Sequence, residues 1–228
     1  MNIIVNGGTR GIGKEVVLAL SRDPKKNILV TGRNTAALKE LSSRQNVQGM
    51  VLDMSEFEIN AGKFFNLVAG GFTKVDILIN VAGLLVPKSF MDITDSESRL
   101  MMETNFFGPA SLIRILKPLM PDGSHIVNIS SMGGVQGSSK YRGLSYYSAS
   151  KAALACLTEC LAEEFRDSGV KVNCLAIGSV QTEMLEEAFP GYRAPVSAKE
   201  MGEFISEFAL NGHKVFNGKI LPVALSNP

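Results

Sequence analysis

The stretch Asn6-Gly7-Gly8-Thr9-Arg10-Gly11-Ile12-Gly13 follows a short apolar run and leads into an apolar helical pattern. Glycines here allow a tight turn, close approach of the backbone to a phosphate, and close packing of a helix on a strand. The N-terminus of the following helix would present unpaired N–H groups to a pyrophosphate. The spacing is Gly-x-x-x-Gly-x-Gly, and a plain strand-to-helix turn is the alternative interpretation. The stretch therefore predicts a Rossmann-type fold with a dinucleotide at the edge of its sheet.

Short β-branched runs alternate with longer helical patterns along the rest of the chain, which favours a parallel sheet covered on both faces. We predict an α/β fold: a single Rossmann-type doubly wound domain over 1–228, with a seven-stranded, mainly parallel sheet and helices on both faces. The predicted strands are Ile3–Asn6, Ile28–Thr31, Val47–Leu52, Val75–Asn80, His125–Ser130, Lys171–Ala176 and Lys219–Val223. The predicted helices are Gly11–Arg22, Thr35–Ser43, Glu56–Val68, Ser96–Met120, Tyr147–Arg166 and Ala198–Leu210.

The overall composition is that of an ordinary globular protein. The chain has 228 residues, 45% hydrophobic and 20% charged, with a formal net charge of +1. This charge provides no electrostatic footprint for nucleic acid or an acidic membrane, and no apolar run is long enough to span a bilayer. The apolar strand at the N-terminus leaves no room for a secretory leader, so we expect a cytoplasmic protein. Its three unclustered cysteines fit reduced thiols, and we expect Cys156 and Cys160 to be buried in apolar packing.

Two arginines bear on which dinucleotide is bound. Arg33 follows the second predicted strand, 20 residues after Gly13, close to where an acidic residue would hold an adenosine 2′-hydroxyl. An arginine at this place instead offers a bidentate partner for a 2′-phosphate. Arg10, inside the glycine-rich stretch, could reach the same phosphate. The pair favours NADP over NAD, and NADPH over NADH, with solvated loop charges as the alternative.

Polar residues also stand at the ends of three other strands. Asp53 could accept a hydrogen bond from the adenine amino group, or it could simply cap the next helix. Asn80 can brace the turn before Ala82 and Gly83, a small pair that would let the backbone approach a ligand. Ser130-Ser131 follow the fifth strand, where a hydroxyl could hold a carbonyl oxygen, although such a pair is usually only a turn.

Two side chains suggest proton transfer, and a third is a polar residue in an apolar helix. Tyr147 and Lys151 lie four residues apart in a predicted helix and therefore share a face. The lysine charge would lower the pKa of the tyrosine toward a useful range, although an incidental surface pair is the alternative. Asn105 interrupts an otherwise apolar helix, and as a buried amide it must find partners.

These residues together resemble the classical short-chain dehydrogenases/reductases over nearly the whole chain. The resemblance is closest to the 3-oxoacyl-acyl-carrier-protein reductase-like and sepiapterin-reductase-like members. The family's glycine motif maps onto Gly7, Gly11 and Gly13, and its Asn-Asn-Ala-Gly motif maps onto Asn80-Val81-Ala82-Gly83. Its helix asparagine maps onto Asn105. Its catalytic serine, tyrosine and lysine map onto Ser131, Tyr147 and Lys151.

The resemblance implies an NADP(H)-dependent oxidoreductase that transfers hydride between nicotinamide and a small carbonyl or secondary alcohol. Tyr147 would be the general acid/base, Lys151 would lower its pKa and bind the nicotinamide ribose, and Ser131 would orient the carbonyl. Asn105 would hold a water in the proton relay, and Thr182 would bind the carboxamide side of the nicotinamide. The resemblance also implies a homodimer or homotetramer.

The expected cofactor-binding residues are Gly7, Thr9, Arg10, Gly11, Ile12, Gly13, Arg33, Asp53, Met54, Asn80, Ala82, Gly83, Tyr147, Lys151 and Thr182. No metal site is expected. A non-catalytic NADP-binding regulator on the same fold is the alternative, but a lysine beside a tyrosine favours an enzyme. A sugar-nucleotide epimerase or dehydratase would need a larger C-terminal substrate domain.

The chain departs from the family pattern at four places. Asn6 replaces a threonine, Val81 replaces the second asparagine, and Ile177 replaces a proline. The interval from Ser131 to Tyr147 is about three residues longer than is common in the family, so Ser130 remains a competitor for the catalytic serine. The loop about 182–197 would recognise the substrate. Lys140 and Arg142 in the longer interval are either solvated charges or attract an anionic substrate.

Overall fold

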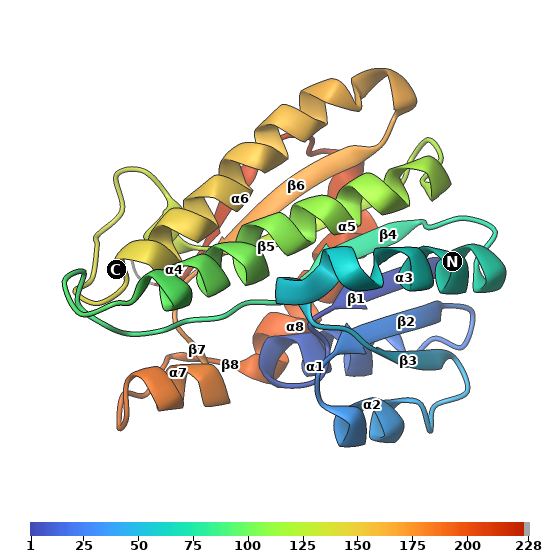
Figure 1. Ribbon diagram of the computed structural model, residues 1–228. Helices are drawn as coiled ribbons and strands as arrows, with labels where there is room; N and C mark the ends of the chain where they lie inside the picture. Colours follow the sequence, from blue (N-terminus) through green and yellow to red (C-terminus); the bar gives the residue numbers. More distant parts are fainter. Residues whose placement is uncertain (226–228) are drawn as a thin grey trace.

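The computed structural model describes residues 1–225. Seven strands form one sheet in the order β3-β2-β1-β4-β5-β6-β9, and every neighbouring pair of them is parallel (Figure 1). The strands are β1 Asn2–Asn6, β2 Asn27–Gly32, β3 Val47–Val51, β4 Ile77–Asn80, β5 His125–Ser131, β6 Lys171–Ile177 and β9 Ile220–Val223. The predicted α/β fold with a seven-stranded parallel sheet is confirmed.

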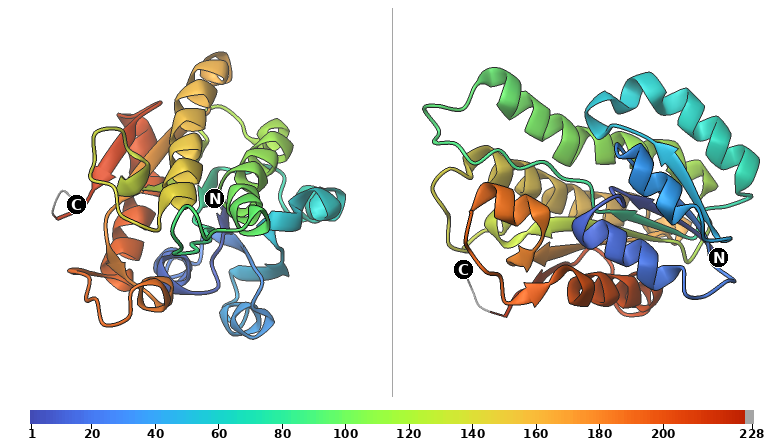
Figure 2. Two further views of the ribbon diagram at one scale, coloured as in Figure 1. Left: turned by 60° about the vertical axis from the view of Figure 1, so that its left-hand side comes forward. Right: turned by 90° about the horizontal axis from the view of Figure 1, so that it is seen from below.

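Helices cover both faces of this sheet, and two apolar cores fill the two interfaces (Figure 2). Successive residues of β1 point to opposite faces, so Ile3 and Val5 enter one core and Ile4 enters the other. The first core is completed by α1 Gly11–Leu20, α2 Thr35–Leu41 and α8 Ala198–Asn211. The second is completed by α3 Phe57–Gly71, α5 Gly108–Leu116 and α6 Ser145–Glu164.

The strand order changes direction at β1, which lies between β2 on one side and β4 on the other. The chain builds outward to β3 and then returns to place β4 on the opposite side of β1. In open parallel sheets, ligands bind beyond the carboxyl ends of the strands at such a reversal. The glycine-rich stretch follows β1 directly, so the fold places it at this point.

The predicted helix Ser96–Met120 is observed as one uninterrupted helical run with a π-helical turn inside it. The run consists of α4 Asp95–Met102, the π-helical turn at Glu103–Phe107 and α5, followed by a short 3-10 turn at Lys117–Leu119. The N–H of Gly108 bonds to the carbonyl of Glu103, five residues earlier. Pro109 has no N–H to donate, so one bond of the α-helical ladder is missing where the π-helical turn meets α5.

The predicted substrate loop 182–197 contains regular structure. It begins with α7 Glu183–Ala188 and ends in β8 Val196–Ser197, which pairs in parallel with β7 Val180–Gln181. β8 leads directly into α8, where Ser197 and Glu200 form a capping box. The segment is therefore anchored at both ends, and α7 projects from it beside the glycine-rich stretch (Figure 1).

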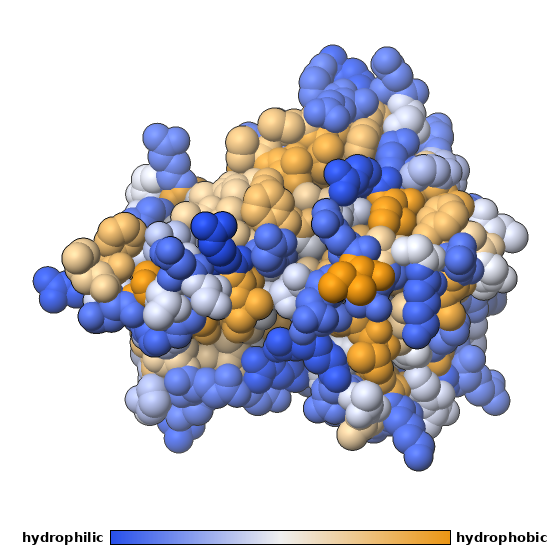
Figure 3. Space-filling model, viewed as in Figure 1, coloured by the Kyte–Doolittle hydropathy of each residue, from blue (hydrophilic) through white to orange (hydrophobic). Residues whose placement is uncertain are grey.

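The expectation that Cys156 and Cys160 are buried is wrong. Both are exposed on α6, and only Cys174, in β6, is buried. Apolar residues gather over α6 on this face of the molecule (Figure 3). Apolar residues of this helix therefore lie on its exposed face as well as on the face that packs against the rest of the protein. Among residues 1–225, no helix has the length and apolar character that crossing a membrane requires.

Candidate active site

The glycine-rich stretch forms a tight turn packed on β4. Gly7 has a φ of +85°, and a Cβ at this position would lie 2.4 Å from the backbone nitrogen of Ala82. A Cβ at Gly13 would lie 2.1 Å from the carbonyl oxygen of Gly7. Any larger residue would force the turn away from the sheet. Within the described chain, no side chain caps the start of α1, so its first N–H groups are available to an anion.

A pocket opens beside this turn, at the carboxyl ends of β1 to β6. It is lined by every expected cofactor-binding residue except Asn80, and it also reaches Ser130. Nine further residues that line it were not predicted to bind the cofactor: Asn6, Gly32, Leu52, Val81, Thr104, Ile129, Ile177, Glu183 and Met184. Most of these residues lie next to a predicted strand end or a recognised motif. Their position in the sequence relative to those elements could therefore have indicated that they line the pocket.

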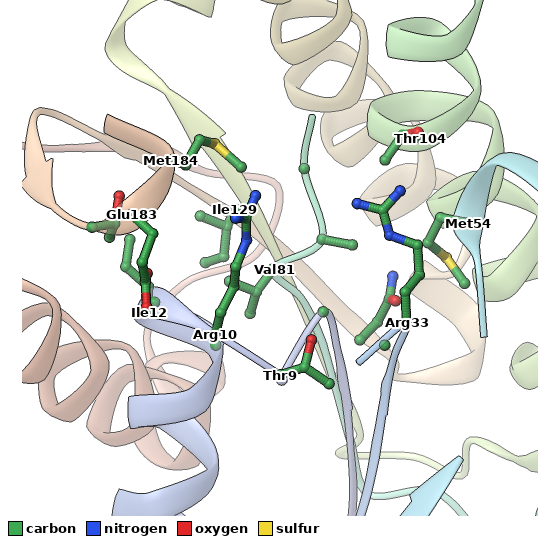
Figure 4. A pocket seen from close by; sticks show the side chains of 18 of the residues that line it. Thr9, Arg10, Ile12, Arg33, Met54, Val81, Thr104, Ile129, Glu183 and Met184 are labelled. Carbon is green, nitrogen blue, oxygen red and sulfur yellow. The ribbon is translucent and has the colours of Figure 1, made fainter. Parts of the chain in front are cut away.

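The two arginines lie on opposite sides of the pocket. Arg10 stands on the side of Glu183 and Met184, whereas Arg33 lies beside Met54 and Thr104 (Figure 4). Each has an acidic neighbour: Arg10 Nη1 is 3.0 Å from Glu187 Oε1 of α7, and Arg33 Nη1 is 3.7 Å from Asp53 Oδ2. Both arginine side chains remain largely exposed, so these pairs are weakly held and can yield to a phosphate.

Asp53 caps the turn after β3, as one of its two predicted roles requires, and it also borders the pocket. Its Oδ1 accepts hydrogen bonds from the N–H and hydroxyl of Ser55 and so caps the turn that follows β3. Partial burial raises the pKa of this carboxyl, but the hydrogen bonds from Ser55 and the charge of Arg33 outweigh it, and the pKa lies below its usual value. The carboxylate is therefore ionised at neutral pH and borders the pocket.

Asn80 acts from beneath the pocket rather than in its wall. Its Nδ2 donates to Asn128 Oδ1 at 2.9 Å, and its Oδ1 accepts from Asn6 Nδ2 at 3.3 Å. Asn6 Oδ1 accepts from Thr31, and Asn128 donates to Thr158 of α6. This buried amide ladder, Thr31–Asn6–Asn80–Asn128–Thr158, crosses β2, β1, β4 and β5 and ties them to α6. Each strand contributes the polar residue near its carboxyl end that faces its neighbour in register.

The side chain of Asn105 is fully buried, and each of its polar atoms has a hydrogen-bond partner. Its Oδ1 accepts from the N–H of Leu84 at 2.7 Å, and its Nδ2 donates to the carbonyl of Leu84 and to Ser150 Oγ, both at 2.9 Å. The π-helical turn presents this amide to the segment after β4. The side chain is a satisfied buried amide, and it joins the segment after Gly83 to the first turn and a half of α6.

The two candidate serines have different surroundings. Ser130 is buried, and its hydroxyl donates to the backbone carbonyl of Lys151 at 2.8 Å. Ser131 is partly exposed at the end of β5, where its Oγ accepts from the N–H of Gly133 at 3.2 Å. A hydrogen bond between Ser131 and Tyr147 also affects the tyrosine. Ser130 is therefore committed to the backbone of α6, whereas the hydroxyl of Ser131 is beside the phenol.

Tyr147 and Lys151 project from the first turns of α6 into the pocket. Lys151 Nζ lies 5.9 Å from the centre of the Tyr147 ring and donates to the carbonyl of Ile129 at 2.9 Å. A Cβ at Gly83 would lie 3.3 Å from this Nζ, so glycine leaves room for the ammonium group. The predicted shared face of the helix is confirmed.

The expected lowering of the Tyr147 pKa is not observed. Burial raises the pKa of Tyr147, and the hydrogen bond with Ser131 lowers it by less. Burial also lowers the pKa of Lys151 to about 8, with Cys174 acting in the opposite direction. Desolvation disfavours the charged form of both groups, and here it exceeds the attraction that the sequence argument considered.

Thr182 borders the pocket but also begins α7. Its Oγ1 accepts from the N–H of Leu185 at 3.3 Å, and its methyl group faces Gly11. Ile177 and Val81, two departures from the expected motifs, supply apolar wall to the same pocket. α7 therefore closes the side of the pocket that faces the start of α1.

Comparison with known proteins agrees with this architecture. The sequence model for "short chain dehydrogenase" matches residues 1–193. The chain belongs to the short-chain dehydrogenase family. It is 29% identical over 201 residues to dehydrogenase/reductase SDR family member 6 of Rattus norvegicus, covering 86% of this chain and 78% of the relative.

Solved structures show the same fold. A short-chain dehydrogenase from Burkholderia cenocepacia in complex with NADP superimposes with a TM-score of 0.85 at 22% identity, covering 97% of this chain and 95% of that one. A structure described as ElxO with NADP bound gives a TM-score of 0.84 at 25% identity, with 98% and 96% covered. The protein is thus a member of a family of oxidoreductases with a Rossmann-type fold.

Proposed function

We propose that the protein is an NADP(H)-dependent oxidoreductase that interconverts a small carbonyl compound and the corresponding secondary alcohol. The observation that carries this proposal is the convergence of Ser131, Tyr147 and Lys151 beside a glycine-lined pocket at the reversal of strand order. A phenol, a hydroxyl and an ammonium group are the groups that carbonyl reduction needs for proton donation and orientation.

The pocket residues fit a dinucleotide. Gly7 and Gly13 leave space that a Cβ would fill, and the start of α1 presents free N–H groups to a pyrophosphate. Arg33 would hold the 2′-phosphate, and Asp53 would accept a hydrogen bond from the adenine amino group. Arg10 would have to leave Glu187 and turn across the pocket to assist Arg33. When bound, the nicotinamide supplies or accepts the hydride. The NADP complexes of two proteins with this fold support this choice of cofactor.

The side chains at the opposite end of the pocket then perform the proton transfer. Ser131 would hold the carbonyl oxygen, and Tyr147 would donate its proton to that oxygen as negative charge develops there. Lys151 would bind the nicotinamide ribose, and its charge would favour the phenolate that proton donation leaves behind. Asn105 would act by fixing Leu84 and α6, and Thr182 would border the nicotinamide. Both amide protons of Asn105 are used, so a water of the proton relay would bind this side chain only by donating to its Oδ1, which accepts one hydrogen bond from Leu84.

The first experiment is a paired calorimetric titration with NADPH and NADH. A charge-assisted contact to the 2′-phosphate contributes about 1.5–3 kcal/mol, so NADPH should bind roughly 10–100 times more tightly. Equal affinities would contradict the assignment of NADP, and an absence of binding by either would contradict the proposed site.

The second experiment uses adjacent tyrosines as test and control. NADPH oxidation is followed with a panel of aldehydes, ketones and 3-oxoacyl thioesters. Tyr147→Phe should lower kcat by about 10²–10⁴ because it removes the proton donor. Tyr146→Phe should retain activity, because Tyr146 stacks on Phe90, with ring centres 5.8 Å apart, and does not line the pocket. A Tyr147→Phe enzyme as active as the wild type would refute the mechanism.

Substrate class and assembly extend the same proposal. The panel includes 3-oxoacyl thioesters because the sequence resembles reductases of that kind, and pterin-type carbonyls test the other resemblance. We expect a homodimer or homotetramer, which sedimentation velocity measures directly.

A further inference from the structure

The segment between Ser131 and Tyr147 is held by a single lysine. Lys140 Nζ donates to the carbonyl of Gly133 at 2.8 Å, the carbonyl of Val135 at 2.6 Å and Ser138 Oγ at 2.9 Å. An ammonium group has three protons to donate, so these three contacts use all of its capacity. The single hydroxyl proton of Ser138 lies within hydrogen-bonding reach of the carbonyls of Met132 and Val135. We call residues 132–140, folded around this ammonium group, the lysine-centred loop.

The lysine-centred loop reaches the serine through one residue. Lys140 holds the carbonyl of Gly133, and the N–H of Gly133 donates to Ser131 Oγ at 3.2 Å. The same turn packs directly on α6: a Cβ at Gly134 would lie 2.8 Å from the backbone nitrogen of Ala152 and 3.1 Å from Lys151 Cβ. The turn Met132–Gly134 is thus wedged between Ser131 and the helix that carries Tyr147 and Lys151.

We propose that Lys140 is a positioning residue: by binding the carbonyls of Gly133 and Val135, it fixes the turn that orients the Ser131 hydroxyl toward Tyr147. This inference rests on the proposed function of the site. The hydrogen bonds of Lys140 within the described chain all go to its own loop, so the role inferred for it is exercised through the turn that binds Ser131. The three hydrogen bonds occupy the donors of Lys140, so its ammonium group could attract an anionic substrate, one of the two sequence-based interpretations, by charge alone. The side chain is exposed, as the other interpretation expects, but it is bound to the loop.

The chain offers a matched control two residues away. Arg142 carries the same charge on the same exposed segment, and within residues 1–225 it forms no ion pair and no side-chain hydrogen bond. Lys140→Met and Arg142→Met therefore remove the same formal charge, but only the first removes the donors that hold the turn. Lys140→Arg keeps a cation with several donors and serves as the conservative variant.

The first test measures kcat and KM for NADPH oxidation with the best carbonyl from the panel. Lys140→Met should lower kcat by about 5- to 50-fold, because small misplacements of reacting groups have large effects on rate, and leave the KM for NADPH unchanged. Because the Ser131 hydrogen bond lowers the pKa of Tyr147, its loss should move the alkaline limb of the kcat profile to higher pH. Arg142→Met should change neither quantity, and Lys140→Arg should recover part of the rate.

A double-mutant cycle separates positioning of Ser131 from a general loss of activity. In a Ser131→Ala background, Lys140→Met should lower kcat less than about twofold, because its route to the chemistry is already removed. Independent effects of the two substitutions, or equal effects of Lys140→Met and Arg142→Met, would overturn the inference.

A second measurement needs no turnover, so failure of the proposed function can be told from failure of this inference. Amide hydrogen exchange at Gly133 is followed by NMR of protein labelled with ¹⁵N-glycine. Lys140→Met should accelerate this exchange at least about tenfold, whereas Arg142→Met should not. A wild type that reduces no carbonyl would refute the proposed function alone. Unchanged exchange at Gly133 in Lys140→Met would refute the role of Lys140.

Discussion

Arg10 is a residue with two possible partners. It extends from the glycine-rich turn toward the pocket, yet its guanidinium group is 3.0 Å from Glu187 in α7. A phosphate that binds Arg10 must compete with this carboxylate. Because both side chains are about half exposed or more, the ion pair contributes only about 0.2–1 kcal/mol.

Removing that carboxylate should favour the phosphorylated cofactor. Glu187→Gln should tighten NADPH binding about 2- to 5-fold, because Arg10 no longer has to leave a charged partner, and should change NADH binding less. Calorimetric titration with both cofactors measures the difference. Glu203→Gln is the matched control, since it breaks a similar exposed pair with Arg22 away from the pocket. A shift of equal size for NADH would show that Arg10 does not contact the 2′-phosphate.

At the scale of elements, the buried amide ladder connects the sheet to the catalytic helix. Asn128 on β5 is the member that links the sheet to this helix, accepting from Asn80 and donating to Thr158 of α6. Asn128→Ala would remove the acceptor of the buried Asn80 amide group and the donor to the buried Thr158 hydroxyl. We expect a loss of about 1–3 kcal/mol in the free energy of unfolding, measured by urea denaturation.

The control for this experiment is an asparagine outside the core. Asn60→Ala on the exposed surface of α3 removes one long hydrogen bond and should cost less than about 0.5 kcal/mol. If Asn128→Ala were no more costly than Asn60→Ala, the ladder would be a packing feature without energetic weight.

Elements with a strong local signal were predictable, and those set by tertiary contacts were not. The parallel sheet could be predicted because the alternation of apolar strands and helices is a pattern of consecutive residues. The π-helical turn before Gly108-Pro109 was not predicted, because the apolar pattern continues around it. The exposure of Cys156 and Cys160 depends on what packs against α6, which the helix sequence does not contain.

The site divides in the same way. Motif residues such as Gly7, Tyr147 and Lys151 were found because their spacing is fixed by backbone geometry. Glu187 and Lys140 were not assigned their partners. Arg10 and Glu187 are 177 residues apart, and the Lys140 contacts, although local, depend on an irregular loop conformation that no periodic pattern predicts. The sign of the Tyr147 shift was also missed, since burial is a property of the folded chain and the pair alone suggests only attraction.

At the scale of the whole molecule, a second polar cluster joins elements at the opposite end of the sheet. His125, the first residue of β5, is fully buried; its Nδ1 contacts the carbonyl of Ala209 in α8 at 2.9 Å, and its Nε2 contacts Asn173 Nδ2 in β6 at 3.1 Å. Its ring lies 5.4 Å from that of His213, centre to centre. Burial lowers the pKa of His125 from 6.5 to about 4, and the pKa of His213 is also lowered, by burial and by Lys214 and Lys171.

This cluster should make the protein less stable in mild acid. As pH falls from 6.5 toward 4, the unfolded chain binds a proton at His125 that the folded chain does not, so the free energy of unfolding falls. The full effect of His125 is on the order of 3 kcal/mol. Carboxylates with lowered pKa values, such as Glu97 at about 2, make stability depend on pH only near and below their usual pKa of 4.5. Between that pH and 6.5, the loss of stability therefore reports the two histidines.

Urea denaturation between about pH 5 and pH 7 measures this effect, because the slope of stability against pH counts protons. The wild type should lose stability steadily below about pH 6.5. His125→Gln, compared by its slope and not by its absolute stability, should lose a large part of the dependence while His213 retains the rest. A wild-type stability that is flat across this range would show that His125 is protonated without opposition in the folded protein, and that the contacts joining β5, β6 and α8 accept a charge.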